Sequence, residues 1–192
     1  MNKERLTAFS DGVIAIIITI MVLELKVPHG ATLAALAEVL PVFVSYVLSF
    51  VFVAIYWNNH HHLLHAARRV NGGILWANMH LLFWLSLLPF TTAWMGENHF
   101  ALWPVAVYGV SMFMPAIAYY ILQALIVAAN GPDRALAQAL GRDLKGKLSP
   151  VLCLAGIGLD FVHPLLGVAA YVVLASMWLI PDRRIERATA LE

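Results

Sequence analysis

Ionisable and hydroxyl side chains lie at the start of the first long apolar run of the chain. Arg5, Ser10 and Asp11 come just before a run of apolar residues that extends from Val13 to Leu25 and is interrupted only by Thr19 and Glu24. Ionisable groups at the mouth of a membrane helix are costly, and they are usually paired or exposed to water. Ser and Asp are also common N-caps of helices. The residues alone therefore leave two interpretations open, a functional polar network and a simple helix cap.

Histidines form the second group that could do chemistry. They cluster at His60, His61, His62 and His65, with His80 on the next apolar run. The i, i+4 spacing of His61 and His65 can bind a metal, and histidines on two helices can hold a haem. No Glu accompanies this pair and no Cys is near it, so we interpret the cluster as interfacial or network histidines and assign no metal site or cofactor.

Two alternative functions rest on these polar groups. One is a haem- or metal-binding membrane redox protein that uses the histidine cluster. The other is a proton pathway or proton-coupled transporter that uses Asp11, His61 or Glu24, because histidine titrates near neutral pH. No Ser-His-Asp arrangement and no phosphate-binding loop is evident in the sequence. We therefore expect a protein that is not an enzyme.

The composition indicates the environment in which these groups work. Of the 192 residues, 61% are hydrophobic and 12% are charged. Soluble domains have roughly 45–50% apolar and about 25% charged residues, so lipid is the solvent that suits this chain. The net charge of +1 offers no basic excess for nucleic acid. The single cysteine, Cys153, excludes a disulfide within the chain.

The elements that must position the polar groups are membrane helices, each of which needs roughly 20 mostly apolar residues. One all-α membrane domain over residues 1–192 is predicted, with six spans, at residues 7–25, 35–65, 73–95, 100–129, 148–162 and 165–180. The last two spans are short and form a tight hairpin. Four prolines near or within spans are interpreted as helix starts or kinks: Pro41, Pro89, Pro104 and Pro115.

Positive charges give the orientation. Six spans place both termini on one side of the membrane, and only Lys26 lies on the other side. The first side holds Lys3, Arg5, Arg68, Arg69, Arg134, Arg142, Lys145, Lys147, Arg183, Arg184 and Arg187. The positive-inside rule then makes both termini cytoplasmic.

Three motifs resemble a known family. Arg5 is followed after three residues by Phe9-Ser10-Asp11 and then by an apolar helix. Trp57 is followed by two Asn and then by His60 and His61, and Leu87-Leu88-Pro89-Phe90 lies on the third span. This set resembles the signature of the transmembrane protein 175 family of lysosomal and bacterial potassium channels.

The resemblance implies a potassium-permeable channel of a bacterial inner membrane, built as a homotetramer whose first helices line a central pore. The family's constriction residue corresponds to Ile16, its further apolar pore positions to Ile20 and Leu23, and its pore threonine to Thr19. Helix geometry is compatible with this assignment, because residues 16, 20 and 23 follow one helical stripe. No Thr-Val-Gly-Tyr-Gly segment is present, so carbonyl rings of the ordinary potassium-channel type are not expected.

A mechanism follows from these positions. Four copies of Ile16 would form an apolar ring that closes by dewetting. Potassium loses water more readily than sodium, so a narrow apolar neck favours potassium, and Thr19 offers oxygen just beyond it. Glu24 is either an outer ring that gathers cations or a marker of the interface. A supporting network is expected from Arg5, Phe9, Ser10, Asp11, Trp57 and His61.

Overall fold

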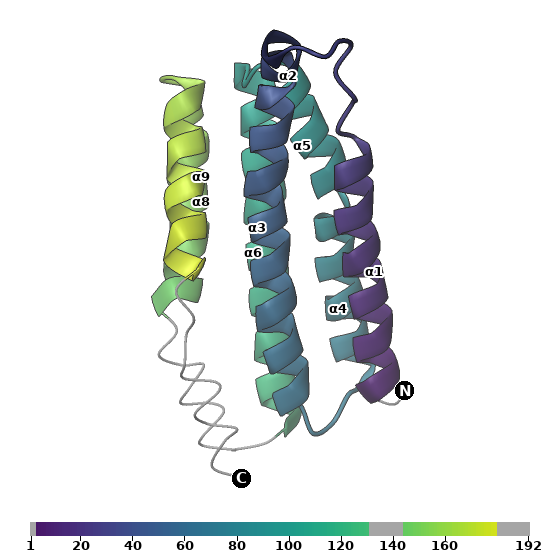
Figure 1. Cartoon of the computed structure of the whole chain (residues 1–192). Helices are drawn as coiled ribbons and strands as arrows, with labels where there is room; N and C mark the ends of the chain where they lie inside the picture. The colour runs from purple at the N-terminus through teal and green to yellow at the C-terminus, as the bar shows by residue number, and fades with distance from the viewer. Residues whose placement is uncertain (1–2, 131–143, 180–192) are drawn as a thin grey trace.

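The structure, a computed structural model, describes residues 3–130 and 144–179, and all of its regular elements are helices. Most of them run along one common direction (Figure 1). The helices are α1 Lys3–Leu23, α2 Leu33–Glu38, α3 Leu40–Ala66, α4 Gly72–Ser86, α5 Leu88–Glu97, α6 Leu102–Asn130, α8 Leu144–Asp160 and α9 Pro164–Leu179.

Four of the helical segments in the described ranges are long and apolar enough to cross a membrane. They are α1, α3, the 26-residue run formed by α4 and α5, and α6 up to Ala129. The remaining two apolar helices, α8 and α9, are shorter. The prediction of an all-helical, multi-pass membrane protein is therefore confirmed, and four of its six predicted spans are long enough to cross.

Two predicted spans are interrupted in the structure. The span predicted at 35–65 is divided at Val39 into α2 and α3, and the span predicted at 73–95 is divided at Leu87 into α4 and α5. Pro41 and Pro89 lie in the first turns of α3 and α5. Proline has no N–H to donate to the preceding turn and is favoured at a helix start, so each proline begins a new helix.

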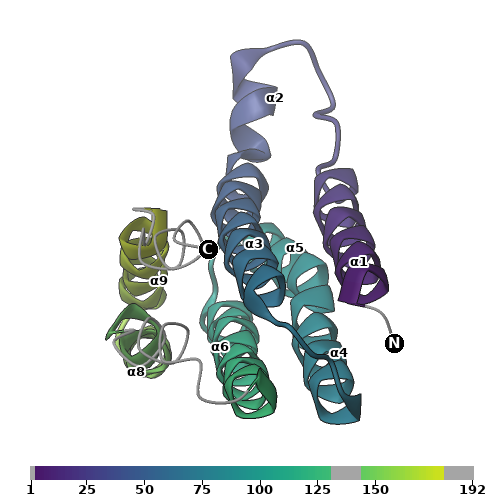
Figure 2. The same cartoon turned by 90° about the horizontal axis from the view of Figure 1, so that it is seen from below.

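The bundle has two sides. Helix α1 packs against α3, α4 and α5, while the α8–α9 hairpin packs against α6, with fewer contacts from α9 to α3. Seen along the bundle, α1 and the α8–α9 hairpin lie on opposite sides of the molecule (Figure 2). Fully buried side chains such as Leu81, Leu85 and Tyr108 fill the space between them.

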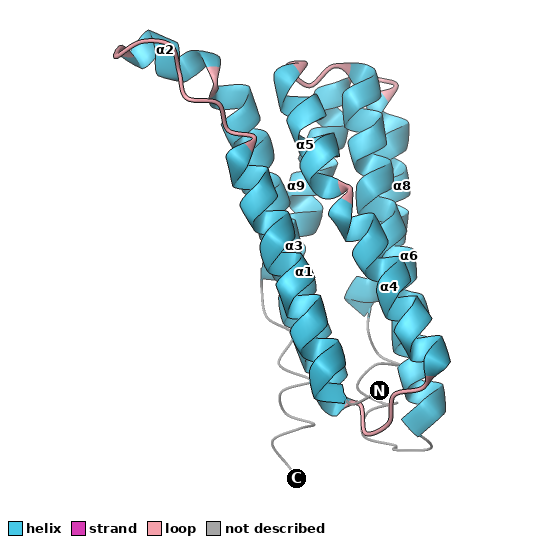
Figure 3. Ribbon diagram, turned by 90° about the vertical axis from the view of Figure 1, so that its right-hand side faces the viewer, coloured by secondary structure: helices cyan, strands magenta, loops and turns pink. Residues whose placement is uncertain are grey.

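Helix α2 extends beyond the end of the bundle. Figure 3 shows it leaning away from the ends of α5 and α6. Thr32 caps its start by accepting a hydrogen bond from the Ala35 N–H at 3.2 Å. Leu33 and Leu36 remain 85% and 55% exposed. An apolar helix that the rest of its own chain does not cover requires lipid or another protein surface.

Candidate functional site

Helix α1 has one face buried in the bundle and one face exposed. Its buried residues are Leu6, Ser10, Ile14, Ile17 and Met21. Its exposed residues include Arg5, Phe9, Ile16, Thr19, Ile20 and Leu23. At 100° per residue the two sets fall on roughly opposite sides of the helix. All four predicted pore positions therefore lie on the face of α1 that its own chain leaves open.

The apolar members of that face are strongly exposed. The exposed fractions are 59% for Ile16, 42% for Ile20 and 75% for Leu23. The Thr19 hydroxyl donates a hydrogen bond to the Ala15 carbonyl at 2.8 Å. A hydroxyl that already donates its one proton still has lone pairs that can accept. The Thr19 oxygen is thus an acceptor that can face a cation.

Behind the exposed face, a buried chain of hydrogen bonds joins three helices. Asn78 of α4 donates through Nδ2 to Ser10 Oγ at 2.9 Å, and Ser10 Oγ donates to the Leu6 carbonyl at 2.9 Å. The other end of the same amide, Asn78 Oδ1, lies 2.6 Å from His60 Nε2. An amide oxygen only accepts, so His60 Nε2 carries the proton. Ser10, His60 and Asn78 are all completely buried.

A second contact ties α1 to α3 nearer the surface. Trp57 Nε1 donates to Asp11 Oδ1 at 3.0 Å. The sequence predicts that Asp11 of the first predicted span and Trp57 of the second belong to one supporting network, and this hydrogen bond joins them. With the buried chain it fixes the rotation of α1, because Ser10 and Asp11 are held from two directions.

The structure joins only part of the predicted supporting network. Ser10, Asp11 and Trp57 take part in it, whereas Arg5 and Phe9 point away on the exposed face of α1. His61 is also exposed, and its ring lies 6.0 Å from the Trp57 ring. The histidine that enters the network is its neighbour, His60.

Sequence reasoning missed Asn78. It lies in an apolar stretch with no motif around it, and its partner Ser10 is 68 positions away. The available signal was a side-chain amide in the middle of an apolar span, because such a group must find a hydrogen-bond partner within the protein.

The histidines do not converge on a common centre. The rings of His61 and His65 stack 6.3 Å apart on the surface of α3, while His60 is turned into the core. His80 accepts a hydrogen bond from Trp84 on its own helix at 2.8 Å. Within residues 3–130 and 144–179, no three His, Cys, Asp or Glu side chains group as metal ligands.

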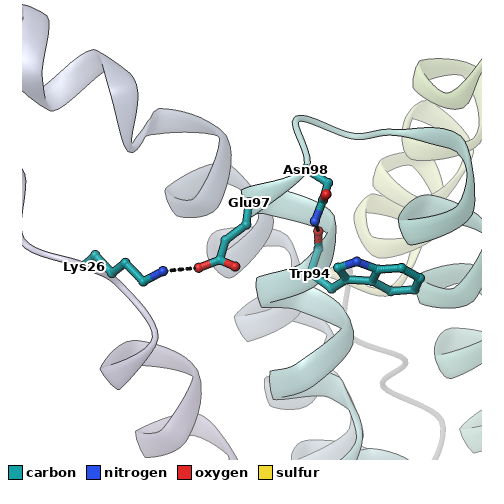
Figure 4. A network of polar contacts seen from close by, with 4 residues as sticks. All are labelled: Lys26, Trp94, Glu97 and Asn98. Carbon is teal, nitrogen blue, oxygen red and sulfur yellow. Dashed lines mark hydrogen bonds and ion pairs between the residues drawn. The ribbon is translucent and has the colours of Figure 1, made fainter.

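At the other end of α1, an ion pair connects the chain to α5. Lys26 follows α1 and pairs with Glu97 at the end of α5 (Figure 4). The hydrogen bond and charge of Glu97 raise the pKa of Lys26 above its ordinary value. Close by, Asn98 donates to the Trp94 carbonyl at 2.9 Å and closes α5. Both ends of α1 are therefore attached to other helices.

Two cavities adjoin this ion pair. One of about 550 Å³ lies between the α1–α2 connection, α3 and α5, and Glu24, Lys26, Glu38 and Glu97 are among its lining residues. The other, of about 440 Å³, runs beside α1 from Ile20 and Glu24 to Phe90 of α5. Glu24 contributes to both, so its exposed side chain lies at the Leu23 end of the apolar stripe.

Comparison with known proteins points to one family. The sequence profile of the endosomal/lysosomal potassium channel TMEM175 family matches residues 5–89. A potassium channel of a Chryseobacterium species is 52% identical, over 98% of each chain. A relative from Gallus gallus, named an endosomal/lysosomal proton channel TMEM175, is 40% identical over 33% of this chain and 15% of its own length.

A solved structure extends the likeness to the fold. The crystal structure of a lysosomal potassium-selective channel TMEM175 homolog from Chamaesiphon minutus superposes with a TM-score of 0.84. The two chains are 28% identical, and the match covers 93% of this chain and 96% of the other. The similarity therefore includes the α8–α9 hairpin, where the sequence carries no distinctive motif.

Proposed function

The chain belongs to the TMEM175 family, and from this premise we propose that it is a potassium-permeable channel whose pore is lined by α1. The observation that carries the proposal is the division of α1 into two faces. Its polar network is buried against α3 and α4, and its stripe of Ile16, Ile20 and Leu23 is left exposed.

One subunit cannot enclose a pore with a single exposed stripe. A homotetramer places four α1 helices around an axis, so that each stripe faces the other three. The resemblance to the family supports this number, and both the exposed stripe and the exposed α2 need a neighbour. The partners of the chain are then lipid, three further copies of itself and the permeating potassium ions.

In this assembly Ile16 forms the narrowest ring. An apolar constriction expels water and closes the pore when it is narrow. When it widens, potassium passes in a partly dehydrated form, and the Thr19 oxygens, three residues further out, replace part of the lost hydration. The Ser10–Asn78–His60 chain and the Trp57–Asp11 bond keep the stripe turned toward the axis.

The same proposal includes six spans and cytoplasmic termini in a bacterial inner membrane. The 17 residues of α8 correspond to a helix of roughly 26 Å, close to the thickness of a bilayer's hydrocarbon core, about 30 Å. Helix α9 is almost as long and lies beside α8. Six spans then leave Lys26 as the one cation outside, which agrees with the positive-inside rule.

The test is ion flux through purified protein in liposomes. The wild-type chain is expected to release potassium faster than sodium. Replacement Ile16→Asn wets the neck, so it should raise the total flux severalfold and bring the two ions closer together. The matched control is Val173→Asn on α9, because Val173 is 60% exposed and Ile16 59%, yet α9 lies on the far side of the bundle.

Two outcomes would contradict the proposal. Equal potassium and sodium flux in the wild-type chain would contradict the proposed selectivity. Identical effects of Ile16→Asn and Val173→Asn would contradict a constriction at Ile16. A pH-sensitive dye inside the same liposomes measures proton flux. Proton flux without potassium flux would favour the proton pathway instead, the activity for which the Gallus gallus relative is named.

A further inference from the structure

The carboxyl group of Asp160 is buried at the end of α8, far from α1. Its side chain is 1% exposed. Tyr171 of α9 donates a hydrogen bond from its hydroxyl to Asp160 Oδ2 at 2.9 Å. The other oxygen, Oδ1, is buried and has no hydrogen-bond partner. A buried, half-satisfied carboxyl in a membrane protein is expensive to maintain and needs a physical explanation.

Three glycines from three helices make the space for this pair. A Cβ atom on Gly167 of α9 would lie 1.6 Å from Asp160 Oδ1. A Cβ on Gly156 of α8 would lie 2.5 Å from the Tyr171 ring, and one on Gly109 of α6 would lie 2.0 Å from its hydroxyl. Every other residue type would fill the site, so the sequence leaves room for Asp160 and Tyr171 at three independent positions.

No positive charge compensates Asp160. In the part of the chain that the structure describes, Asp160 forms no ion pair, and its hydrogen-bond partner is the Tyr171 hydroxyl. Tyr171 and Tyr108 pack edge to face with ring centres 5.8 Å apart. Cys153 is buried earlier on α8, before Asp160. His163, in the turn after α8, is exposed and accepts a bond from the Leu165 N–H through its Nδ1.

The surroundings of Oδ1 suit a donor better than an acceptor. A Cβ atom on Gly167 would lie 1.6 Å from Asp160 Oδ1 and 2.8 Å from the Gly156 carbonyl oxygen, so these two oxygens are at most about 4.4 Å apart. Two acceptors side by side repel each other, whereas a carboxylic acid hydroxyl beside a carbonyl forms a hydrogen bond. A protonated Asp160 accepts at Oδ2 and donates at Oδ1, which satisfies both oxygens.

We propose that Asp160 is a proton-binding site that clamps the α8–α9 hairpin to α6. The proton is taken from water, and it forms an O–H bond at Oδ1 that donates to the Gly156 carbonyl. Loss of the proton leaves a charged Oδ1 with no donor, and an unpaired buried charge is strongly unfavourable. The pocket around Tyr171 then has to open, and the hairpin loosens from α6.

This site is independent of the proposed ion pathway. It is built from α6, α8 and α9, on the opposite side of the bundle from α1 (Figure 2). Its failure or success therefore leaves the potassium proposal untouched.

Infrared spectra of the full chain in lipid nanodiscs test the proton directly. A protonated carboxyl has a carbonyl stretching band apart from those of amides and carboxylates. The wild-type chain is expected to keep such a band at pH values where exposed carboxyls are ionised, and to lose it as the pH rises further. Asp160→Asn should abolish the band, while Glu38→Gln, which changes an exposed carboxylate on α2, should leave it in place.

Thermal unfolding of the same samples gives the second readout. The folded chain holds a proton that the unfolded chain releases, so the wild-type midpoint should fall as pH rises. Asp160→Asn should remove most of this slope, because its amide donates to the Gly156 carbonyl at every pH. A band that is absent at mildly acidic pH, or one that survives Asp160→Asn, overturns the proposal. So does an unchanged slope in Asp160→Asn.

Tyr171→Phe separates the proton from general packing. It removes the donor to Oδ2 and keeps the ring, so the band should persist at a shifted frequency. Disappearance of the band in this variant, with the fold intact, would show that the hydroxyl and not the carboxyl environment holds the proton, and would overturn the proposal.

Discussion

At the scale of single residues, the polar side chains of α1 have different partners according to how deeply they are buried. Ser10 is buried and serves as a link between the backbone of α1 and α4. One position later, Asp11 is partly exposed and meets α3 through Trp57. Neither side chain belongs to the exposed stripe. They act as positioning residues, which determine where Ile16 and Thr19 point.

Asn78 is the residue whose loss should cost the most stability in this network. Replacement Asn78→Ala leaves the buried His60 Nε2–H without an acceptor and Ser10 Oγ without its outside donor. An unmade buried hydrogen bond costs about 1–3 kcal/mol. We expect a loss of that size in the free energy of unfolding, measured by denaturation in mixed micelles.

A control for this variant comes from α3. Asn59 donates through Nδ2 only to the Ile55 carbonyl of its own helix, at 2.9 Å. Asn59→Ala therefore removes one local bond and leaves no buried partner behind, and it should cost less. Equal losses for the two variants would mean that the buried chain does not hold α1 against α4.

At the scale of elements, the sequence predicted what hydropathy and proline chemistry determine. The apolar runs gave the helices, and the view of Pro41 and Pro89 as helix starts or kinks agrees with their place in the first turns of α3 and α5. The separate helix α2 was not predicted, because five of its six residues are apolar and merge in the sequence with the span that follows.

The tertiary network could be predicted only in part for a related reason. The motifs singled out Ser10, Asp11 and Trp57, which the structure joins. The choice between His60 and His61 depends on the rotation of α3, and a helix that is apolar on all sides gives no sequence signal of its rotation. The hydrogen bond from His60 to Asn78 shows which face of α3 is turned into the bundle.

The Lys26–Glu97 pair should attach the segment that follows α1 to the end of α5. Lys26→Glu places two acidic groups together and should lower the unfolding midpoint by less than Asn78→Ala does, because the pair is exposed and screened by salt. The exchange Lys26→Glu with Glu97→Lys should restore the midpoint at low salt. Additive effects of the two single changes would show that the pair does not couple the elements.

The pH dependence of this attachment has a definite sign. Glu97 raises the pKa of Lys26, so the lysine's contribution is complete at neutral pH. It is lost only as the pH rises through the raised lysine pKa in the folded chain. Near neutral pH the contribution of Lys26 should therefore be constant.

At the scale of the whole molecule, large exposed apolar side chains occur on every helix that the structure describes. They include the stripe of α1, and also the leucines of α2 with Leu40, Phe43 and Val44 in the first turns of α3. Lipid suits any apolar face, but α2 extends past the end of the bundle (Figure 3). A second copy of the chain would cover both regions at once, as the proposed tetramer requires.

Crosslinking at the end of α1 tests that arrangement. Leu23, the last residue of α1, and Val162, in the turn between α8 and α9, are both 75% exposed. The end of α1 and the α8–α9 turn lie toward the same end of the bundle (Figure 1). In a Cys153→Ser background, Leu23→Cys should give covalent dimers with a short bis-maleimide, because neighbouring α1 helices face one axis. Val162→Cys should give few, since the α8–α9 hairpin lies away from α1 and from that axis. Native mass spectrometry of the unlinked protein should show four copies, and efficient linking at residue 162 but not at residue 23 would place α1 on the outside and the hairpin at the centre, against the proposed pore.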